Sequence, residues 1–265
     1  MPPARKRTRT YDAATTRTAV LTQFGHVRDA VTALTPGQLA LPTRLGDWTV
    51  RDLAAHLTMA VGSVSTALER EEPASADLGP LDYGSATAGF ADAIAEGSHA
   101  LAEAHPDLGA LYARTAERLA ADLAAAPPGR LVATRAGGMT LTDHLVTRTI
   151  ELVVHTDDLN DAVPGLDVPL ERKALAACTR VLADTLAARA PGGSTEVRVP
   201  PYAVVQCVEG PRHTRGTPPN VVETDPLTWI RLATGRLAWR EAVAEAKVSA
   251  SGERADLAGL LPLLT

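Results

Sequence analysis

Aromatic residues are scarce in this 265-residue sequence: Phe, Trp and Tyr together make up 3% of it. Positive charge is also in deficit, since 26 Lys and Arg face 31 Asp and Glu, for a formal net charge of -5. Such a composition offers little for base stacking or for a groove that follows phosphates, which argues against a dedicated nucleic-acid-binding protein. The basic start of the chain is the exception, and we interpret residues 1–11 as a disordered basic tail.

Long apolar runs and paired cysteines are missing as well. No uncharged stretch of about 18 apolar residues occurs, which argues against a membrane span. No apolar run follows the basic first ten residues, as it would in a secretory signal, so we expect a cytoplasmic protein. Cys178 and Cys207 are too few for a disulfide framework and lack the spacing of a metal site, which indicates two buried thiols in a reducing compartment.

Helical patterns dominate from about residue 12 to residue 190. Apolar residues recur there at intervals of three and four in Ala/Leu-rich segments, which predicts five or six helices. The expected spans are about residues 15–34, 49–69, 86–104, 109–125, 140–162 and 170–190. A capping box from Thr49 to Asp52 predicts the start of the second helix. Residues 12–191 are therefore predicted to form an all-α domain.

The pattern changes after Pro191-Gly192-Gly193, where β-branched residues become frequent. Strands are expected over about residues 196–208 (one or two), 220–223 and 247–251, and helices over about residues 227–234, 239–246 and 254–264. Asp225-Pro226 supports the first of these helices, because it offers an N-cap followed by proline at the first helical position. Residues 194–265 are therefore predicted to form a small α+β domain.

Polar side chains recur along one face of the helix expected at residues 140–162. They are His144, Arg148, Glu151, His155 and Asp158, and steps of three and four return to the same face of a helix. Apolar residues flank this stripe on both sides. Taken alone, the pattern favours an amphipathic helix whose polar stripe lies in water.

Glu151 and His155 are also a workable pair of metal ligands, because a carboxylate oxygen and an imidazole nitrogen four residues apart can converge beside the helix. A catalytic zinc site uses three protein ligands and leaves one position open. His56 is the best third candidate, since it lies in the apolar run 53–57; the alternative is a core histidine bonded to a carbonyl. The oxygen and nitrogen donors would admit zinc, nickel, manganese or iron.

A resemblance to a known family rests on these residues. The segment Trp48-Thr-Val-Arg-Asp-Leu-Ala-Ala-His56-Leu57, followed about ninety residues later by Arg148-x-x-Glu151-x-x-x-His155-x-x-Asp158, resembles the N-terminal domain of the mycothiol-dependent maleylpyruvate isomerase family. The resemblance covers about residues 12–165 and implies a DinB-like, up-down four-helix bundle with extra helices. It also implies that His56, Glu151 and His155 bind a divalent metal, that this metal is zinc, and that mycothiol is a cosubstrate.

The C-terminal part resembles a different domain, the one related to sterol carrier protein type 2. The residues that carry this likeness, over about residues 195–265, are Asp225-Pro-Leu-Thr-Trp229, Gly235-Arg236 and the segment from Val248 to Gly252. The run 206–220 is similar to the bacterial variant of that domain. In the isomerase family an arginine of the C-terminal domain reaches the active site, and the resemblance offers Arg236 as its counterpart. The alternative is that Arg236 caps the helix end at Gly235.

Two functions of different classes follow from these resemblances. The first is an enzyme in which a zinc-bound thiolate, supplied by mycothiol, attacks a small electrophile in an isomerase or S-transferase reaction. In this enzyme Asp158 would orient His155, and Arg148 or Arg236 would hold a substrate carboxylate. For Arg148 and Asp158 the alternative is that they lie on a solvated helix face.

The second function is that of a non-enzymatic carrier whose C-terminal domain binds a lipid or other hydrophobic ligand. A metal-dependent hydrolase is a third possibility, and the oligomeric state stays open.

Overall fold

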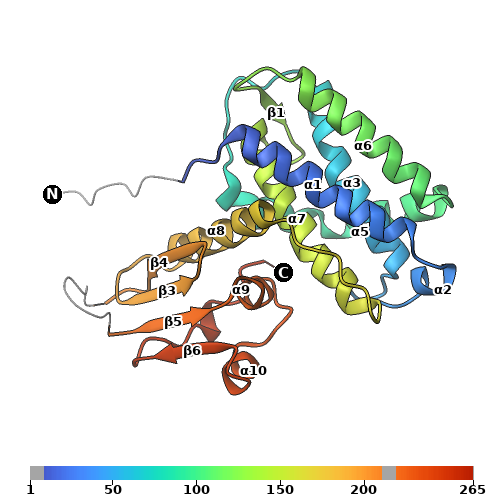
Figure 1. Cartoon of the computed structure of the whole chain (residues 1–265). Helices are drawn as coiled ribbons and strands as arrows, with labels where there is room; N and C mark the ends of the chain where they lie inside the picture. The colour runs from blue at the N-terminus through green and yellow to red at the C-terminus, as the bar shows by residue number, and fades with distance from the viewer. Residues whose placement is uncertain (1–8, 211–218, 265) are drawn as a thin grey trace.

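The computed structural model describes residues 9–210 and 219–264, with a helical part followed by a small sheet (Figure 1). Residues 1–8, 211–218 and 265 lie outside the described residues, and with them most of the expected basic tail and of the run 206–220. Among the described helices, none is long and apolar enough to cross a membrane.

Four long helices make a closed bundle. They are α1 (Ala13–Thr32), α3 (Val50–Glu69), α6 (Leu108–Ala125) and α7 (Leu141–Ala162). Each packs against two of the others, since α1 contacts α6 and α7, and α3 contacts the same two helices. Their apolar faces bury residues such as Phe24 and Tyr112, whose rings stack at 5.1 Å. As expected from the capping box, α3 begins directly after Thr49, whose hydroxyl accepts from the amide of Asp52.

Shorter elements connect the four long helices. They are α2 (Pro36–Leu39), η1 (Pro80–Asp82), α4 (Tyr83–Thr87), η2 (Ala88–Phe90), α5 (Ala91–Ala104), and the hairpin strands β1 (Leu131–Ala133) and β2 (Gly138–Thr140). The continuous helix expected over residues 86–104 is therefore wrong in its first turn, since α5 begins only at Ala91. Gly89 weakens helix propensity in that turn. Just before it, a Cβ at Gly84 would lie 2.2 Å from Leu264, so α4 packs closely against the end of the chain.

The C-terminal sheet has four strands, β3 (Thr195–Val199), β4 (Ala203–Cys207), β5 (Val221–Thr224) and β6 (Val248–Ser251), in the order β4-β3-β5-β6. β3 and β5 are parallel, and the other neighbours are antiparallel. Helix α8 (Arg172–Arg189) packs on β4 and α9 (Pro226–Ala233) as well as on α1 and α7, so it joins the sheet to the bundle. α10 (Trp239–Ala244) follows α9.

The helix expected over residues 254–264 is wrong. Only a short turn, η3 (Ala258–Leu260), forms there. Pro262 lacks an amide donor and cannot continue a helix, and the amides of Leu263 and Leu264 bond instead to the carbonyl of Ala233, at 2.7 and 3.0 Å. The end of the chain therefore runs back along α9 toward the bundle.

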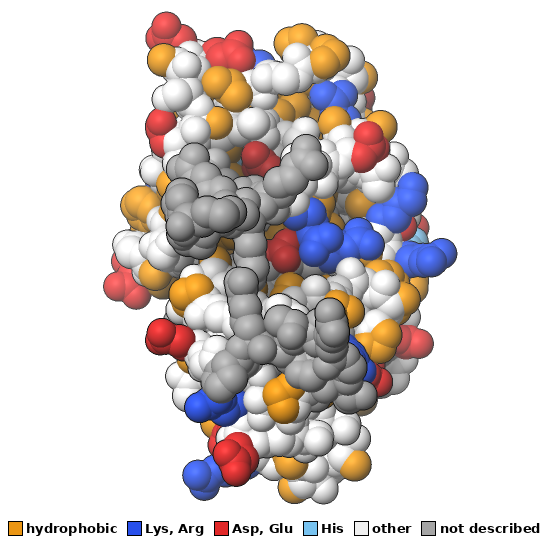
Figure 2. All heavy atoms as spheres, turned by 90° about the vertical axis from the view of Figure 1, so that its left-hand side faces the viewer, with side chains coloured by type: hydrophobic (Ala, Val, Ile, Leu, Met, Phe, Trp, Pro, Cys, Tyr) orange, Lys and Arg blue, Asp and Glu red, His pale blue; other side chains and the backbone are white. Residues whose placement is uncertain are grey.

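The face that carries the N-terminal segment and the edge of the sheet is seen in Figure 2. Its described side chains mix acidic, basic and hydrophobic types, with one small group of Lys and Arg near the middle. They do not form a continuous basic strip.

Candidate metal centre

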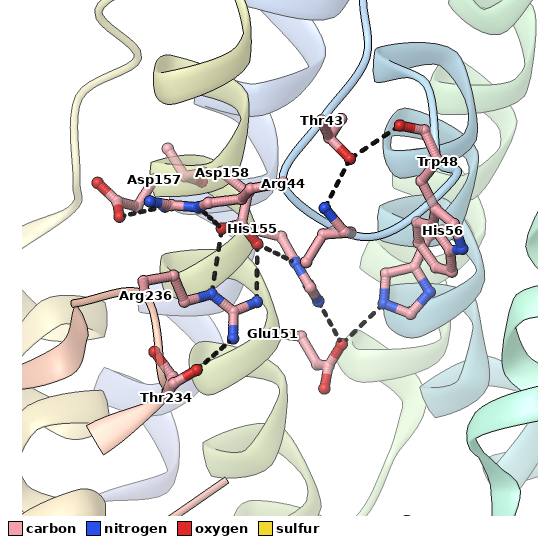
Figure 3. Close-up of polar contacts among 12 residues, drawn as sticks. Thr43, Arg44, Trp48, His56, Glu151, His155, Asp157, Asp158, Thr234 and Arg236 are labelled. Carbon is pink, nitrogen blue, oxygen red and sulfur yellow. Dashed lines mark hydrogen bonds and ion pairs between the residues drawn. The ribbon is translucent and has the colours of Figure 1, made fainter. Parts of the chain in front are cut away.

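Helices α3 and α7 bring together the three residues that the sequence singled out as metal ligands. His56 comes from α3, and Glu151 and His155 lie one turn apart on α7. One ligand atom from each lies within 4.8 Å of the others. Glu151 Oε2 is 2.9 Å from His56 Nε2 and 3.5 Å from His155 Nε2 (Figure 3).

The hydrogen bonds of His56 assign its tautomer. The Ser98 hydroxyl donates to the carbonyl of Ile94 at 2.7 Å, so its oxygen is left to accept from His56 Nδ1, 3.2 Å away. A proton on Nδ1 satisfies this contact, and Nε2 is the atom of His56 that faces Glu151. Ser98 was not expected at the site, because it comes from α5, 42 residues along the chain.

His155 is held in the same tautomer by a carboxylate. Its Nδ1 lies 2.8 Å from Asp158 Oδ2, and an ionised carboxylate can only accept. Both imidazoles thus turn Nε2 toward the same oxygen of Glu151. Three acceptor atoms that converge in a largely buried site are unfavourable unless a proton or a cation lies among them. Two imidazole nitrogens and one carboxylate oxygen are also a ligand set of catalytic zinc sites, so these residues fit a divalent cation.

The charges of the site depend on burial and on these hydrogen bonds. Burial lowers the pKa of His56, even though Glu151 works against this shift. Burial opposes protonation of His155 as well, but hydrogen bonds to Asp158 and Glu151 outweigh it and raise the pKa of His155 to about 9. Burial also disfavours ionised Glu151 and Asp158, yet their hydrogen bonds to the histidines hold both carboxyl pKa values well below the usual range. A bound metal would therefore displace the proton of His155, which makes metal affinity depend on pH.

Tyr83 is a site residue that sequence reasoning missed. Its phenol, from α4, donates to Glu151 Oε1 and so leaves Oε2 turned toward the histidines. Burial raises the pKa of Tyr83, so the phenol keeps the proton that it donates. The guanidinium carbon of Arg148 lies 5.3 Å from the centre of the Tyr83 ring. The Pro/Ser/Asp-rich segment before Tyr83 carried no signal that this tyrosine would reach α7.

Asp158 is fully buried and is held by two arginines. Besides His155, it accepts from Arg44 Nε at 2.6 Å and from Arg236 Nε and Nη2 at 3.1 and 2.9 Å. Arg236 also donates to the carbonyl of Thr234 at 2.7 Å, so it caps the end of α9 and reaches the site at the same time. Arg236 thus makes the contact expected of a helix cap and also lies beside the site (Figure 3).

The polar stripe of α7 does not lie in water, so the amphipathic-surface interpretation is wrong. His144, Arg148 and Asp158 are 5%, 7% and 0% exposed. α7 is covered by α1, α3 and α8, and His144, Arg148, Glu151 and His155 of the stripe line a cavity whose wall is shared with α3, α5 and the end of the chain. The sequence period gave the right face, but periodicity alone does not tell a polar stripe on the wall of a cavity from one in solvent.

The cavity beside the three ligands has a volume of about 1160 Å³. Its wall includes His56, Glu151, His155, Trp48, Arg148, Arg236 and, from the end of the chain, residues 262–264. Neither Cys178 nor Cys207 lines it, and both are buried elsewhere. This volume exceeds that of most single-ligand pockets, which run to about 1,000 Å³.

Among the described arginines that line this wall, Arg148 is the buried one. Its guanidinium donates to the Ala60 carbonyl at 3.1 Å and to the Thr147 hydroxyl at 3.1 and 3.2 Å. Within residues 9–210 and 219–264, no carboxylate lies within ion-pair distance of it. Arg236, by contrast, is paired with Asp158. A buried cation without an acidic partner is costly, so an anion bound beside Arg148 would be stabilised.

His144 makes stability depend on pH. Burial, helped by the positive charge of Arg148, lowers the pKa of His144 to about 3. The unfolded chain takes up this proton near pH 6.5 but the folded chain only near pH 3, so the free energy of unfolding falls as the pH drops through that window. We expect a loss of ~2 kcal/mol from this residue between pH 7 and pH 5. Urea unfolding at pH 7 and pH 5, with a chelator present, measures this loss of unfolding free energy. The loss should be smaller for His144→Gln than for wild type, and equal losses would contradict this assignment.

Each of the two parts of the chain matches a known protein family. Residues 20–160 match the family model of the mycothiol maleylpyruvate isomerase N-terminal domain, which is more than half of the chain. The chain belongs to the mycothiol maleylpyruvate isomerase family. Residues 171–263 match the family described as bacterial SCP ortholog, that is, the sterol-carrier-like domain. Both resemblances seen in the sequence are thereby confirmed, together with the mainly helical fold that ends in a small α+β part.

Solved structures agree with this family at the level of the fold. The chain is similar to the crystal structure of the mycothiol-dependent maleylpyruvate isomerase, with a TM-score of 0.62 at 16% identity over 96% of this chain and 97% of that chain. A mutant of the enzyme of that name, with a histidine replaced by alanine, gives a TM-score of 0.60 at 14% identity over the same shares. A search of curated proteins found no matching relative.

Proposed function

We propose that this family member is a zinc- and mycothiol-dependent enzyme that adds a thiol to a small electrophile, as an isomerase or an S-transferase. The observation that carries the proposal is the convergence of His56 Nε2, Glu151 Oε2 and His155 Nε2 at the wall of a large cavity. The structurally similar proteins are mycothiol-dependent isomerases by name, which supports the same class of reaction.

The residues around the three ligands would fix the orientation of the ligand side chains. A divalent cation at this point would lower the pKa of a thiol ligand so that the thiolate is present at neutral pH. Ser98 and Asp158 keep the Nδ1 protons of the two histidines in place, and Tyr83 holds the other oxygen of Glu151. Such supports fix the orientation of each donor before a metal binds.

The thiol would come from solution. Cys178 and Cys207 are buried away from the cavity, and burial raises the pKa of the Cys178 thiol, so neither is a nucleophile for a substrate there. The cavity volume of about 1160 Å³ leaves room for a thiol cosubstrate and a second small molecule.

Arg148, rather than Arg236, would bind a carboxylate of the electrophile. Arg236 already donates two N–H groups to Asp158, whereas Arg148 meets only a carbonyl and a hydroxyl. The Arg148 guanidinium lies against Tyr83, whose phenol touches Glu151, so an anion on Arg148 would lie beside the metal ligands. We assign Arg236 to holding Asp158 and closing the cavity wall.

Metal content and thiol requirement test the proposal on the wild-type protein. We expect about one zinc per chain by elemental analysis, as a single three-ligand site requires. Turnover of an electrophilic carboxylate should need both the metal and added mycothiol, and should stop after chelation and return with zinc. Turnover without any thiol would point to a hydrolase and contradict the proposal. A metal-free protein with co-purified lipid would instead support the carrier function.

A further inference from the structure

The loop between α2 and α3 is closed on itself by short contacts. The amide and the hydroxyl of Thr43 both donate to the carbonyl of Trp48, each at 2.9 Å. The Thr43 hydroxyl oxygen accepts from the amide of Leu45 at 3.1 Å, and Pro42 forms a β-bridge with Thr49. Residues 42–49 therefore form a tied loop, which we call the bracket loop, whose side chains are set in fixed directions.

The two ends of the bracket loop reach the two histidines of the site. The Trp48 ring meets the His56 ring edge to face at 5.1 Å. Arg44 does not touch His155 but donates to Asp158 Oδ1 at 2.6 Å, while Asp158 Oδ2 accepts from His155 Nδ1 at 2.8 Å (Figure 3). One loop thus supports the ring of one histidine directly and that of the other through a carboxylate.

Arg44 differs from the other arginines near these carboxylates because it bonds two of them. Its Nη2 donates to Asp157 at 2.6 Å in addition to the bond from Nε to Asp158. Arg231 of α9 reaches only Asp157, at 2.6 and 2.9 Å, and Arg236 reaches only Asp158. Arg44 therefore joins the contact that docks α9 on α7 to the contact that orients His155.

We propose that Arg44 is a positioning residue of the metal centre. The Asp158 carboxylate can hold the His155 ring only if it cannot turn, and Arg44 and Arg236 approach it from two different segments of the chain. Removing Arg44 leaves a fully buried carboxylate held by Arg236 alone, which loosens the orientation that it imposes on the imidazole. The inference rests on the proposed function in one respect, which is that His155 is a metal ligand.

Cobalt binding to the full-length protein tests this role without an activity assay. For Arg44→Gln we expect cobalt affinity, measured by competition with a chromophoric chelator, to fall by about 10-fold, the lower end of the loss typical for a direct partner of a metal-bound histidine, because Arg44 acts on His155 through Asp158. The visible spectrum of the cobalt-saturated variant should change, because the freed His155 ring alters the coordination geometry. Arg44→Lys keeps the charge but not the two-pronged contact, so it should recover only part of the affinity.

Two control variants separate the positioning of His155 by Arg44 from two other effects, the docking of α9 on α7 and the loss of any one positive charge. Arg231→Gln removes a contact to Asp157 alone, so it should lower thermal stability while cobalt affinity and spectrum stay those of wild type. Arg28→Gln, in an exposed pair with Asp29, should change neither.

The outcomes distinguish this inference from the proposed function. If wild type binds cobalt and folded Arg44→Gln binds it with the same affinity and spectrum, the role of Arg44 is overturned and the proposed function stands. If wild type itself binds no cobalt or zinc, both fail. If Arg44→Gln does not fold, by far-ultraviolet circular dichroism, the affinity and spectrum of Arg44→Lys decide in the same way.

Discussion

Glu151→Gln should remove metal binding and thiol transfer together. Glu151 Oε2 is the atom that both histidine Nε2 atoms approach, at 2.9 and 3.5 Å, and an amide in its place brings no charge. Losing an outer partner of a metal ligand costs about 10–100-fold, so the loss of the ligand itself should lower metal affinity and kcat/KM by about 100-fold or more. Elemental analysis and a mycothiol conjugation assay measure the two effects on the same preparation.

A matched control separates this effect from a general loss of carboxylate. Glu117 lies exposed on α6, away from the cavity wall, and Glu117→Gln should keep wild-type metal content and turnover. A Glu151→Gln protein that is folded, contains one zinc per chain and turns over at the wild-type rate would refute the proposed site.

Arg148→Gln should weaken the enzyme selectively toward electrophiles that carry a carboxylate. Arg148 is 7% exposed, so an anion bound to its guanidinium would be shielded from water. Truncating one partner of a buried charge pair costs about 2–5 kcal/mol, so kcat/KM should fall by roughly 100-fold. Most of the change should appear in KM, because the contact exists in both the bound substrate and the transition state.

The control compares two substrates and two arginines. An uncharged electrophile of similar reactivity should lose little activity in Arg148→Gln. Arg17 also donates to carbonyls, those of Leu123 and Ala126, but lies outside the cavity wall, so Arg17→Gln should leave both substrates unaffected. Equal losses on the charged and the uncharged substrate would show that Arg148 supports the structure of the site rather than the binding of an anion.

Several features of this protein could be predicted from local patterns. The capping box at Thr49 locates the start of α3, and Asp225-Pro226 locates the start of α9. Helical spacing puts Glu151 and His155 one turn apart, and the apolar surroundings of His56 indicate an inward-facing histidine. These predictions succeed because caps and side-chain periods depend on residues within about four positions of each other.

Predictions that needed distant partners were less successful. The expected helix over residues 254–264 is absent because Leu263 and Leu264 bond to Ala233, some 30 positions earlier. The stripe on α7 was expected in water because its cover, from α1, α3 and α8, cannot be read from α7 itself. In both cases a long-range contact decides against the local preference.

From local patterns, the sequence by itself determined the helices and placed Glu151 and His155 one turn apart; the resemblance to a known family added the bundle and His56 as the third residue of the site. Only the tertiary structure decided which side chains support these three residues. Tyr83 meets Glu151 across 68 positions, and Arg44 meets Asp158 across 114. Such partners share no period or spacing, because they are chosen by the packing of one helix against another. The same packing buries Arg148, with no carboxylate of the described residues within ion-pair distance.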